Sequence, residues 1–153
     1  MRRIAINGFG RIGRALFRLS LEPGADFEVV AINDLTDTAT LAHLLAYDSV
    51  WPRFDHTVEA GEDSLIVDGR EIAVFSEKNP ADIDWTSKDV ELVVESTGIF
   101  TRRDQAEAHL GGTVKTVVLS APGKDVDATF VMGVNEDTYD PDRHEVVSNA
   151  SCT

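Results

Sequence analysis

The chain has 153 residues, of which 42% are hydrophobic, so it is long enough for the core of one domain and short for two. Its 14 basic and 27 acidic residues give a formal net charge of −13, which argues against a nucleic-acid partner. We expect a cytoplasmic protein without a membrane partner, because no apolar run of about 18 residues and no apolar leader is present. The single cysteine, Cys152, excludes an internal disulfide and a cysteine-rich metal site, and we expect no bound metal.

The first part of the chain predicts a strand, a tight turn, a helix and a second strand. Ile4–Ile6 is a short apolar run that ends before a group of glycines. Ile12, Leu16 and Leu19 then recur at helical spacing. Phe27–Ile32 is a β-branched, mostly apolar run typical of a buried strand. Together these segments form one βαβ unit.

A second helix and a hairpin are expected next. Thr38 can cap a helix that ends near Tyr47. Leu65–Val67 and Ile72–Phe75 flank Asp68-Gly69, a dipeptide typical of a tight hairpin turn. We expect this antiparallel hairpin at the periphery of the sheet.

The rest of the chain returns to alternating strands and helices. Leu92–Val94 and Thr116–Leu119 are strand-like and enclose a short helix from Asp104 to Leu110. Phe130–Met132 and Val146–Val147 are two more short apolar runs. The repeated alternation predicts an α/β fold, with a Rossmann-type, doubly wound, mainly parallel sheet and an inserted antiparallel hairpin.

A G-x-G-x-x-G pattern, from Gly8 to Gly13, falls where the first strand turns into the first helix. Gly8 permits the tight turn, Gly10 lets a pyrophosphate approach the backbone, and Gly13 lets the helix and strand pack closely. The backbone amides near Arg11 and Ile12, at the positive end of the helix, are predicted to bind the phosphates. The alternative is that the glycines serve packing only.

Asp34 completes this fingerprint, because an acidic residue is expected about 20 positions after the last glycine, at the end of the second strand. Its carboxylate would accept hydrogen bonds from the adenosine ribose and repel the 2′-phosphate of NADP, which favours NAD as cofactor. An ordinary helix cap is the alternative, since Thr36–Thr38 also resembles cap chemistry.

Cys152 follows the run Val146–Val147 and lies among small polar residues that suit the start of a helix. Unpaired backbone amides and the helix dipole stabilise a thiolate, so this cysteine is a candidate nucleophile. A buried, unreactive cysteine is the alternative.

The chain resembles the phosphorylating glyceraldehyde-3-phosphate dehydrogenase family through a series of short motifs. The resemblance rests on the occurrence of these motifs together and in the same order as in the family. They span nearly the whole chain and are AINGFGRIGR at 5–14, AINDL at 31–35, YDS at 47–49, ESTG at 95–98, SAPGK at 120–124, GVN at 133–135 and SNASCT at 148–153.

The resemblance implies a dinucleotide-binding domain over residues 1–150 and the start of a catalytic domain at 151–153. It implies that NAD is bound by ten residues, with Asp34 at the adenosine ribose, Lys78 near the adenine and Thr97 and Ser120 near the nicotinamide half. The ten are Asn7, Gly8, Gly10, Arg11, Ile12, Gly13, Asp34, Lys78, Thr97 and Ser120.

The resemblance also implies a reaction and a substrate. Cys152 would attack the aldehyde of glyceraldehyde 3-phosphate, whose phosphate contacts Ser151 and Thr153. Loss of hydride to NAD would leave a thioester, and inorganic phosphate would release 1,3-bisphosphoglycerate, a step of glycolysis. The family further implies a homotetramer.

Several parts of that machinery do not occur in this sequence: the general-base histidine, a phosphate-binding arginine and a C-terminal helix. We therefore expect the chain itself to be inactive. Its four histidines all precede Cys152, match no catalytic position and are expected to be structural or exposed; they are His43, His56, His109 and His144.

Three other functions remain open. Erythrose-4-phosphate dehydrogenase shares the architecture and the cysteine, although Asp34 and the motif at 120–124 favour the three-carbon substrate. The chain can also be a noncatalytic NAD-binding module. A regulatory dinucleotide sensor would bind NAD and carry an unreactive Cys152.

Overall fold

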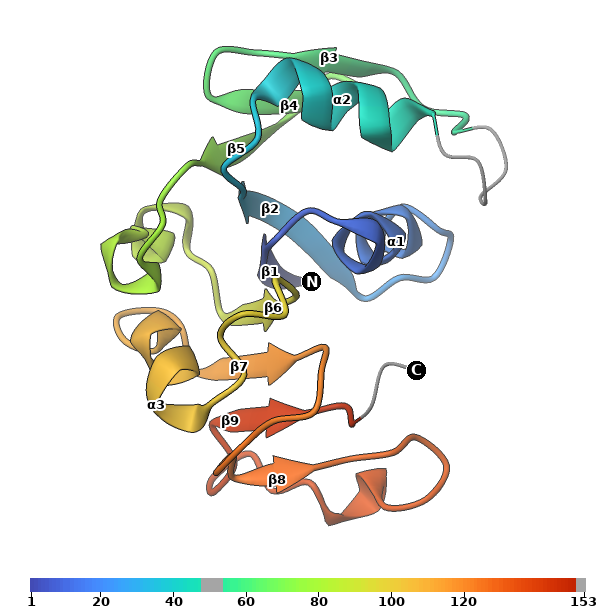
Figure 1. Cartoon of the computed structure of the whole chain (residues 1–153). Helices are drawn as coiled ribbons and strands as arrows, with labels where there is room; N and C mark the ends of the chain where they lie inside the picture. Colours follow the sequence, from blue (N-terminus) through green and yellow to red (C-terminus); the bar gives the residue numbers. More distant parts are fainter. Residues whose placement is uncertain (48–53, 151–153) are drawn as a thin grey trace.

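The computed structural model describes residues 1–47 and 54–150 and contains one mixed sheet, shown in Figure 1. Its strands are β1 (Arg2–Asn7), β2 (Phe27–Asn33), β3 (Val58–Ala60), β4 (Ser64–Val67), β5 (Arg70–Phe75), β6 (Leu92–Glu95), β7 (Thr116–Leu119), β8 (Ala128–Thr129) and β9 (Val146–Ser148). They lie in the order β3-β4-β5-β2-β1-β6-β7-β9-β8. The pairs β3–β4 and β4–β5 are antiparallel and the others parallel, which confirms the predicted Rossmann-type fold with an antiparallel hairpin.

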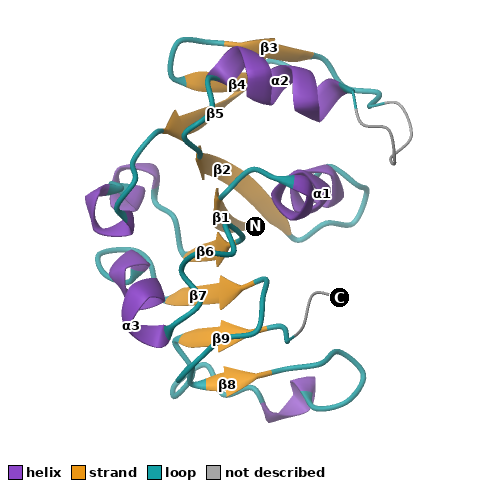
Figure 2. Ribbon diagram, in the orientation of Figure 1, coloured by secondary structure: helices purple, strands orange, loops and turns teal. Residues whose placement is uncertain are grey.

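Helices cover both faces of the sheet (Figure 2). They are α1 (Arg11–Ser20), α2 (Thr38–Ala46), α3 (Arg103–Ala106) and the short 3₁₀ helices η1 (Pro80–Asp82), η2 (Trp85–Lys88), η3 (Glu107–His109) and η4 (Glu136–Thr138). On one face, Phe17 of α1 and Leu45 of α2 pack against Ile4 and Ile6. On the other face, Trp85 packs against Ala5 and Val93, and Ala106 against Val117. Alternate residues of β1 thus enter opposite layers, as the period of a strand requires.

The helix after the glycine pattern is confirmed, but its buried side differs from the apolar spacing in the sequence. Gly13 and Phe17 are the buried residues of α1, whereas Ile12 and Leu19 are each 53% exposed. The cause is the close approach of α1 to β1: a Cβ on Gly13 would lie 2.5 Å from the Gly8 carbonyl oxygen and 2.9 Å from Cγ2 of Ile6. The helix therefore turns its glycine, and not Ile12, toward the sheet.

The predicted cap of the second helix was wrong by one residue. Asp37 is the N-cap of α2, and its Oδ1 accepts a hydrogen bond of 2.8 Å from the Thr40 amide, which lowers the pKa of Asp37. The Thr38 hydroxyl instead donates to the carbonyl of Gly61 at 2.7 Å. The helix ends at Ala46, with Tyr47 as its C-cap, and the motif residues 48–49 lie outside the described part of the chain.

The hairpin turn at Asp68-Gly69 is confirmed, because both residues have positive φ, at 52° and 81°, as a type I′ turn requires. Its position in the sheet differs in part from the prediction. The unpredicted β3 is the edge strand and β4 lies between it and β5, whereas β5 also pairs in parallel with β2.

The C-terminal part of the sheet contains one displaced element. Phe130–Met132 was predicted as an apolar run in the strand series, but the strand β8 comes just before it. The chain turns there because the Val131 amide donates to Oδ1 of Asn135 and the Val134 amide to the carbonyl of Val131. The predicted helix from Asp104 is confirmed as α3 continued by η3.

We predict that Gly13→Ala destabilises the chain by about 1–3 kcal/mol, because the added methyl overlaps Gly8 and Ile6 in a packed region. Urea unfolding followed by circular dichroism measures the loss. Gly10→Ala is the matched control, since a Cβ there meets no atom within 4 Å and φ is −81°. Equal stability of the two variants would contradict the packing role of Gly13.

The carboxylate of Asp127 binds the backbone at the start of β9. Its Oδ2 accepts bonds of 2.9 Å from the amides of Glu145 and Val146, and Arg103 lies 3.4 Å from its Oδ1. Burial raises the pKa of Asp127, but the two amides and the Arg103 guanidinium outweigh burial, and the pKa is lowered overall.

We predict that Asp127→Asn lowers the free energy of unfolding by about 1–2 kcal/mol at neutral pH. Because the folded pKa lies below the unfolded value, the carboxylate stabilises the fold above about pH 4, and this contribution disappears as the pH falls through the folded pKa. Unfolding curves of both proteins should therefore converge in acid. A difference that stays constant from neutral to acidic pH would contradict this account.

Candidate functional site

A cleft of about 480 Å³ opens at the carboxyl ends of the central strands. It is lined by residues at or after the ends of β1, β2, β5 and β6, namely Asn7, Gly8, Gly10, Asn33, Asp34, Leu35, Glu77, Lys78, Ser96, Thr97, Ile99 and Phe100. The chain proceeds from β1 outward to β2 and β5, and then returns to β6 on the other side of β1. A crevice forms where neighbouring connections diverge in this way, and open α/β sheets bind their ligands there.

The glycine loop forms one wall of the cleft. Gly8 has φ of 93°, and a Cβ there would lie 2.8 Å from the Thr97 amide nitrogen and from its Cγ2. Gly10 is the N-cap of α1, and no side chain caps this helix. A Cβ on Gly10 would enter open space. The loop thus leaves room for a ligand where the backbone is most accessible.

The amino end of α1 suits an anion. The first amides of a helix have no partner within the helix, and here no acidic side chain lies in the first turn. Arg11 and Ile12 are exposed beside the cleft, while Gly13 is buried and packs against β1. The unpaired amides and the helix dipole favour a phosphate group at this point.

Asp34 joins the glycine loop to the end of β2. Its Oδ2 accepts a hydrogen bond of 2.8 Å from the Phe9 amide, and its Oδ1 accepts one of 2.9 Å from the Thr36 amide. Asp34 is therefore not the helix cap considered as its alternative role, since Asp37 caps α2. Each carboxylate oxygen can accept a second bond, so the half-buried group still offers acceptors to a ligand in the cleft.

The outer part of the cleft is apolar. Leu35 and Ile99 line it and are 59% and 68% exposed, and Phe100 lies next to Ile99. Exposed aliphatic and aromatic side chains at a cleft suit a flat heterocycle, which loses apolar surface to water when it binds between them. Lys78 lies at the same cleft and supplies a positive charge.

The predicted site residues separate into four groups. Arg11, Ile12 and Gly13 follow Gly10 as the first residues of α1 and do not line the cleft. Asn7, Gly8, Gly10, Asp34, Lys78 and Thr97 line the cleft together. Ser120 lies one strand further on, after β7, where its amide donates to the carbonyl of Glu95 at 3.1 Å. Ser151, Cys152 and Thr153 lie outside the described residues.

A buried polar network that the sequence analysis missed lies under the cleft floor. Glu95 and His109 are each 3% exposed, and Oε2 of Glu95 lies 2.6 Å from Nε2 of His109 and 2.6 Å from Nδ2 of Asn7. The sequence feature that could have predicted this network is Glu95, which comes directly after the apolar run Leu92–Val94. A carboxylate buried at such a position requires several hydrogen-bond donors around it.

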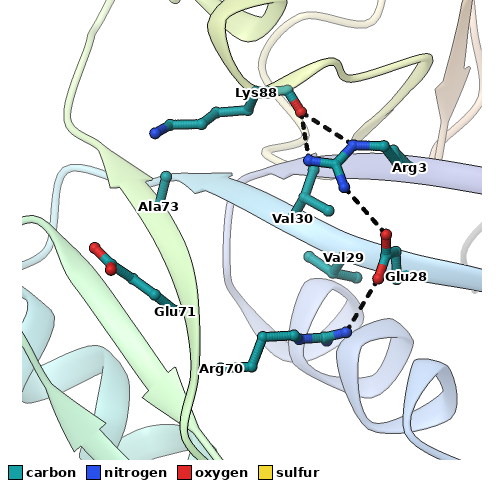
Figure 3. Close-up of a pocket in the computed structure, with 8 residues that line it drawn as sticks. All are labelled: Arg3, Glu28, Val29, Val30, Arg70, Glu71, Ala73 and Lys88. Atoms are coloured by element: carbon teal, nitrogen blue, oxygen red, sulfur yellow. Dashed lines mark hydrogen bonds and ion pairs between the residues drawn. The ribbon is translucent and has the colours of Figure 1, made fainter.

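A second cleft, of about 300 Å³, lies at the opposite ends of the strands. Figure 3 shows Glu28 of β2 between Arg3 and Arg70, with ion pairs of 3.2 Å to each. Arg3 also donates to the carbonyl of Lys88. Both oxygens of Glu28 are thus engaged in ion pairs within the fold, and the carboxyl-end cleft is the better ligand site.

Neither a metal site nor a membrane-spanning helix occurs in the part of the chain that the structure describes. No group of three or more histidine, cysteine or acidic side chains there is arranged to hold a metal ion. None of the helices in residues 1–47 and 54–150 is long and apolar enough to cross a membrane.

Residues 2–103 match the family model described as glyceraldehyde 3-phosphate dehydrogenase, NAD binding domain. The chain belongs to this family. It is 59% identical to a glyceraldehyde-3-phosphate dehydrogenase of Streptomyces coelicolor over 99% of the chain and 45% of the relative, and 57% identical to one of Bacillus cereus over 100% and 46%. It is 54% identical to that of Thermotoga maritima over 100% and 46%. The chain thus spans about half the length of the curated relatives it matches.

NAD is the cofactor of this NAD-binding domain family, and the cleft fits it. The helix end beside Gly10 provides unpaired amides for a pyrophosphate, and Asp34 provides carboxylate acceptors for a ribose diol. The apolar surfaces of Leu35 and Ile99 suit the adenine ring.

We predict that Asp34→Asn weakens NAD binding about tenfold, because a charge-assisted bond to the ribose is lost. NADP binding should fall less or improve, since the variant removes the repulsion of the 2′-phosphate. Calorimetric titration with both cofactors measures the ratio. An equal loss for NAD and NADP would assign Asp34 only to the support of the Phe9 and Thr36 amides.

Proposed function

We propose that the protein to which this NAD-binding domain belongs oxidises glyceraldehyde 3-phosphate with NAD and inorganic phosphate to 1,3-bisphosphoglycerate. The observation that carries the proposal is the cleft at the switch point between β1 and β6, in a chain 59% identical to a glyceraldehyde-3-phosphate dehydrogenase. The aldehyde chemistry rests on Cys152, and the cofactor chemistry on the cleft.

We assign the cofactor contacts along the cleft from the adenine end. Leu35, Ile99 and Lys78 would surround the adenine, and Asp34 would bind the adenosine ribose. The amides of Arg11 and Ile12 would bind the pyrophosphate. Thr97 and Asn7 lie on the β6 side and lead toward the nicotinamide half, where Ser120 would complete the site.

The position of β9 supports Cys152 as the nucleophile. β9 runs parallel to β7, and the Asn149 amide donates to the carbonyl of Leu119 at 3.1 Å. The described chain therefore reaches Ala150 at the same sheet edge as the cofactor cleft, and Cys152 follows two residues later in the sequence. A nucleophile beside the nicotinamide half of the cofactor is what hydride transfer requires.

The proposed reaction follows from the chemistry of a thiolate. Cys152 adds to the aldehyde carbon, and the resulting hemithioacetal carries its alkoxide on that carbon. NAD supplies the acceptor for the hydride that this carbon loses. The remaining thioester is cleaved by phosphate, which forms the acyl phosphate and returns the thiolate. Ser151 and Thr153 would bind a phosphate group beside the nucleophile.

We further propose a cytoplasmic homotetramer for the whole protein, and no turnover by the 153-residue chain alone. Exposed apolar side chains after β8 support an interface there: Met132 is 79% exposed and Val134 is 75% exposed. Contiguous apolar surface marks interaction sites, and these two side chains, only two positions apart, would contribute to such a surface.

We predict that a full-length polypeptide carrying this domain reduces NAD with glyceraldehyde 3-phosphate and phosphate, and that Cys152→Ser reduces the rate to background while NAD binding persists. Absorbance of NADH measures the rate, and calorimetry the binding. Erythrose 4-phosphate is assayed in parallel. A higher kcat/KM for the tetrose, or an active Cys152→Ser variant, would overturn the proposal.

A further inference from the structure

We propose that Trp85, His109 and Glu95 form a buried positioning relay that fixes the floor of the NAD cleft and orients the Thr97 hydroxyl as an acceptor toward the cofactor. The inference rests on the proposed role of Thr97 at NAD. None of these three residues lines the cleft, and each acts through a neighbour that does.

The direction of the relay is set by Trp85. Its indole Nε1–H lies 3.0 Å from Nδ1 of His109, and an indole nitrogen can only donate. Nδ1 of His109 therefore accepts and carries no hydrogen. The ring must then hold its proton on Nε2, which makes His109 a neutral imidazole that donates to Glu95 at 2.6 Å.

Glu95 accepts hydrogen bonds from three neighbouring residues. His109 and Asn7 both donate to Oε2, each at 2.6 Å. These two donors lie side by side, which accounts for the distance of 3.5 Å between their nitrogens. The hydroxyl of Thr97 lies 2.5 Å from Oε1, and its amide donates to the same oxygen at 3.2 Å. Four donors from neutral groups thus replace the water that a buried carboxylate loses.

The network acts on the cofactor through the hydroxyl of Thr97, whose orientation it sets. Its proton is directed at Oε1 of Glu95, so its oxygen can only accept from other groups. The Ile99 amide donates to one side of this oxygen at 3.2 Å. The remaining lone pair serves a ligand group that donates, such as a ribose hydroxyl or an amide N–H of NAD.

The same network holds the neighbouring strand ends in register. Oδ1 of Asn7 accepts from Nδ2 of Asn33 at 2.8 Å, and Asn33 in turn exchanges two bonds with the backbone of Glu77. Because β1, β2, β5 and β6 are connected in this way, a change at His109 reaches the cleft without touching the cofactor. His109 is therefore a positioning residue.

The relay predicts that His109→Leu weakens NAD binding about tenfold, because Glu95 loses a donor and its hold on Thr97 changes. His109→Gln keeps an N–H donor and should stay within about threefold of the wild type. His144→Leu is the matched control: its ring packs against Phe130 and Tyr139, away from the cleft, so stability falls while NAD affinity is unchanged. Calorimetry on folded protein measures each affinity. Wild-type affinity in folded His109→Leu would overturn the relay.

A long-range ¹H–¹⁵N NMR spectrum of the wild-type chain at about pH 7 tests the relay without cofactor. The expected signal for His109 is a neutral ring protonated at Nε2, and Trp85→Phe should allow the other tautomer while keeping an aromatic ring against Phe75. A charged ring, or a proton on Nδ1 in the wild type, would sink the proposal. If a full-length polypeptide carrying this domain fails to bind NAD, the proposed function fails, and this spectrum still decides the relay.

Discussion

The contact between Gly13 of α1 and the carbonyl of Gly8 at the end of β1 sets the geometry of the rest of the domain. A Cβ at position 13 would lie 2.5 Å from that oxygen, so α1 approaches the sheet as closely as a glycine permits. This approach directs the amino end of α1 at the crevice between β1 and β6 and buries Phe17 against the sheet. Side-chain burial of this size stabilises the fold by about 1.5–3 kcal/mol. The anion-binding end of the helix and the core on this face thus depend on the same contact.

A second constraint comes from the polar groups that the strand ends bury. Asn7, Asn33 and Glu95 follow apolar strand residues and are 2%, 4% and 3% exposed. An unpaired polar group in this environment costs about 1–3 kcal/mol, and more when charged, so every donor and acceptor must find a partner. The partners lie on neighbouring strands and on His109. Satisfied networks of this kind rigidify a core and specify one arrangement of the groups under the cleft.

The sequence predicted what depends on local spacing. The strand-turn-helix at Gly8 to Gly13, the hairpin turn at Asp68-Gly69 and the position of Asp34 at the end of the second strand were all predicted from neighbouring residues, and the structure agrees. What failed depends on tertiary contacts. The buried side of α1 is set by the close approach at Gly13, and the helix cap at Asp37 by which side chain reaches the Thr40 amide.

The contacts of the buried network could not be predicted for the same reason. Glu95 and His109 are 14 positions apart, and Asn7 and Glu95 are 88 positions apart, so no short pattern relates them. His109 was expected to be structural or exposed on the ground that it matches no catalytic position. The structure confirms the structural role and adds its partner, because only the fold brings η3 under the end of β6.

The net charge of −13 and the binding of an anionic cofactor are compatible because they act over different distances. In physiological salt, repulsion from surface carboxylates reaches about 8–10 Å before it is screened. This range is sufficient to disfavour a long polyanion that lies along the surface. A pyrophosphate at the end of α1 would meet the backbone amides of a helix that no side chain caps. Arg3 and Arg70 lie at the opposite ends of the strands, where both pair with Glu28. The proposed anion binding therefore depends on oriented backbone dipoles, and the negative charge proposed to select NAD at Asp34 is compatible with it.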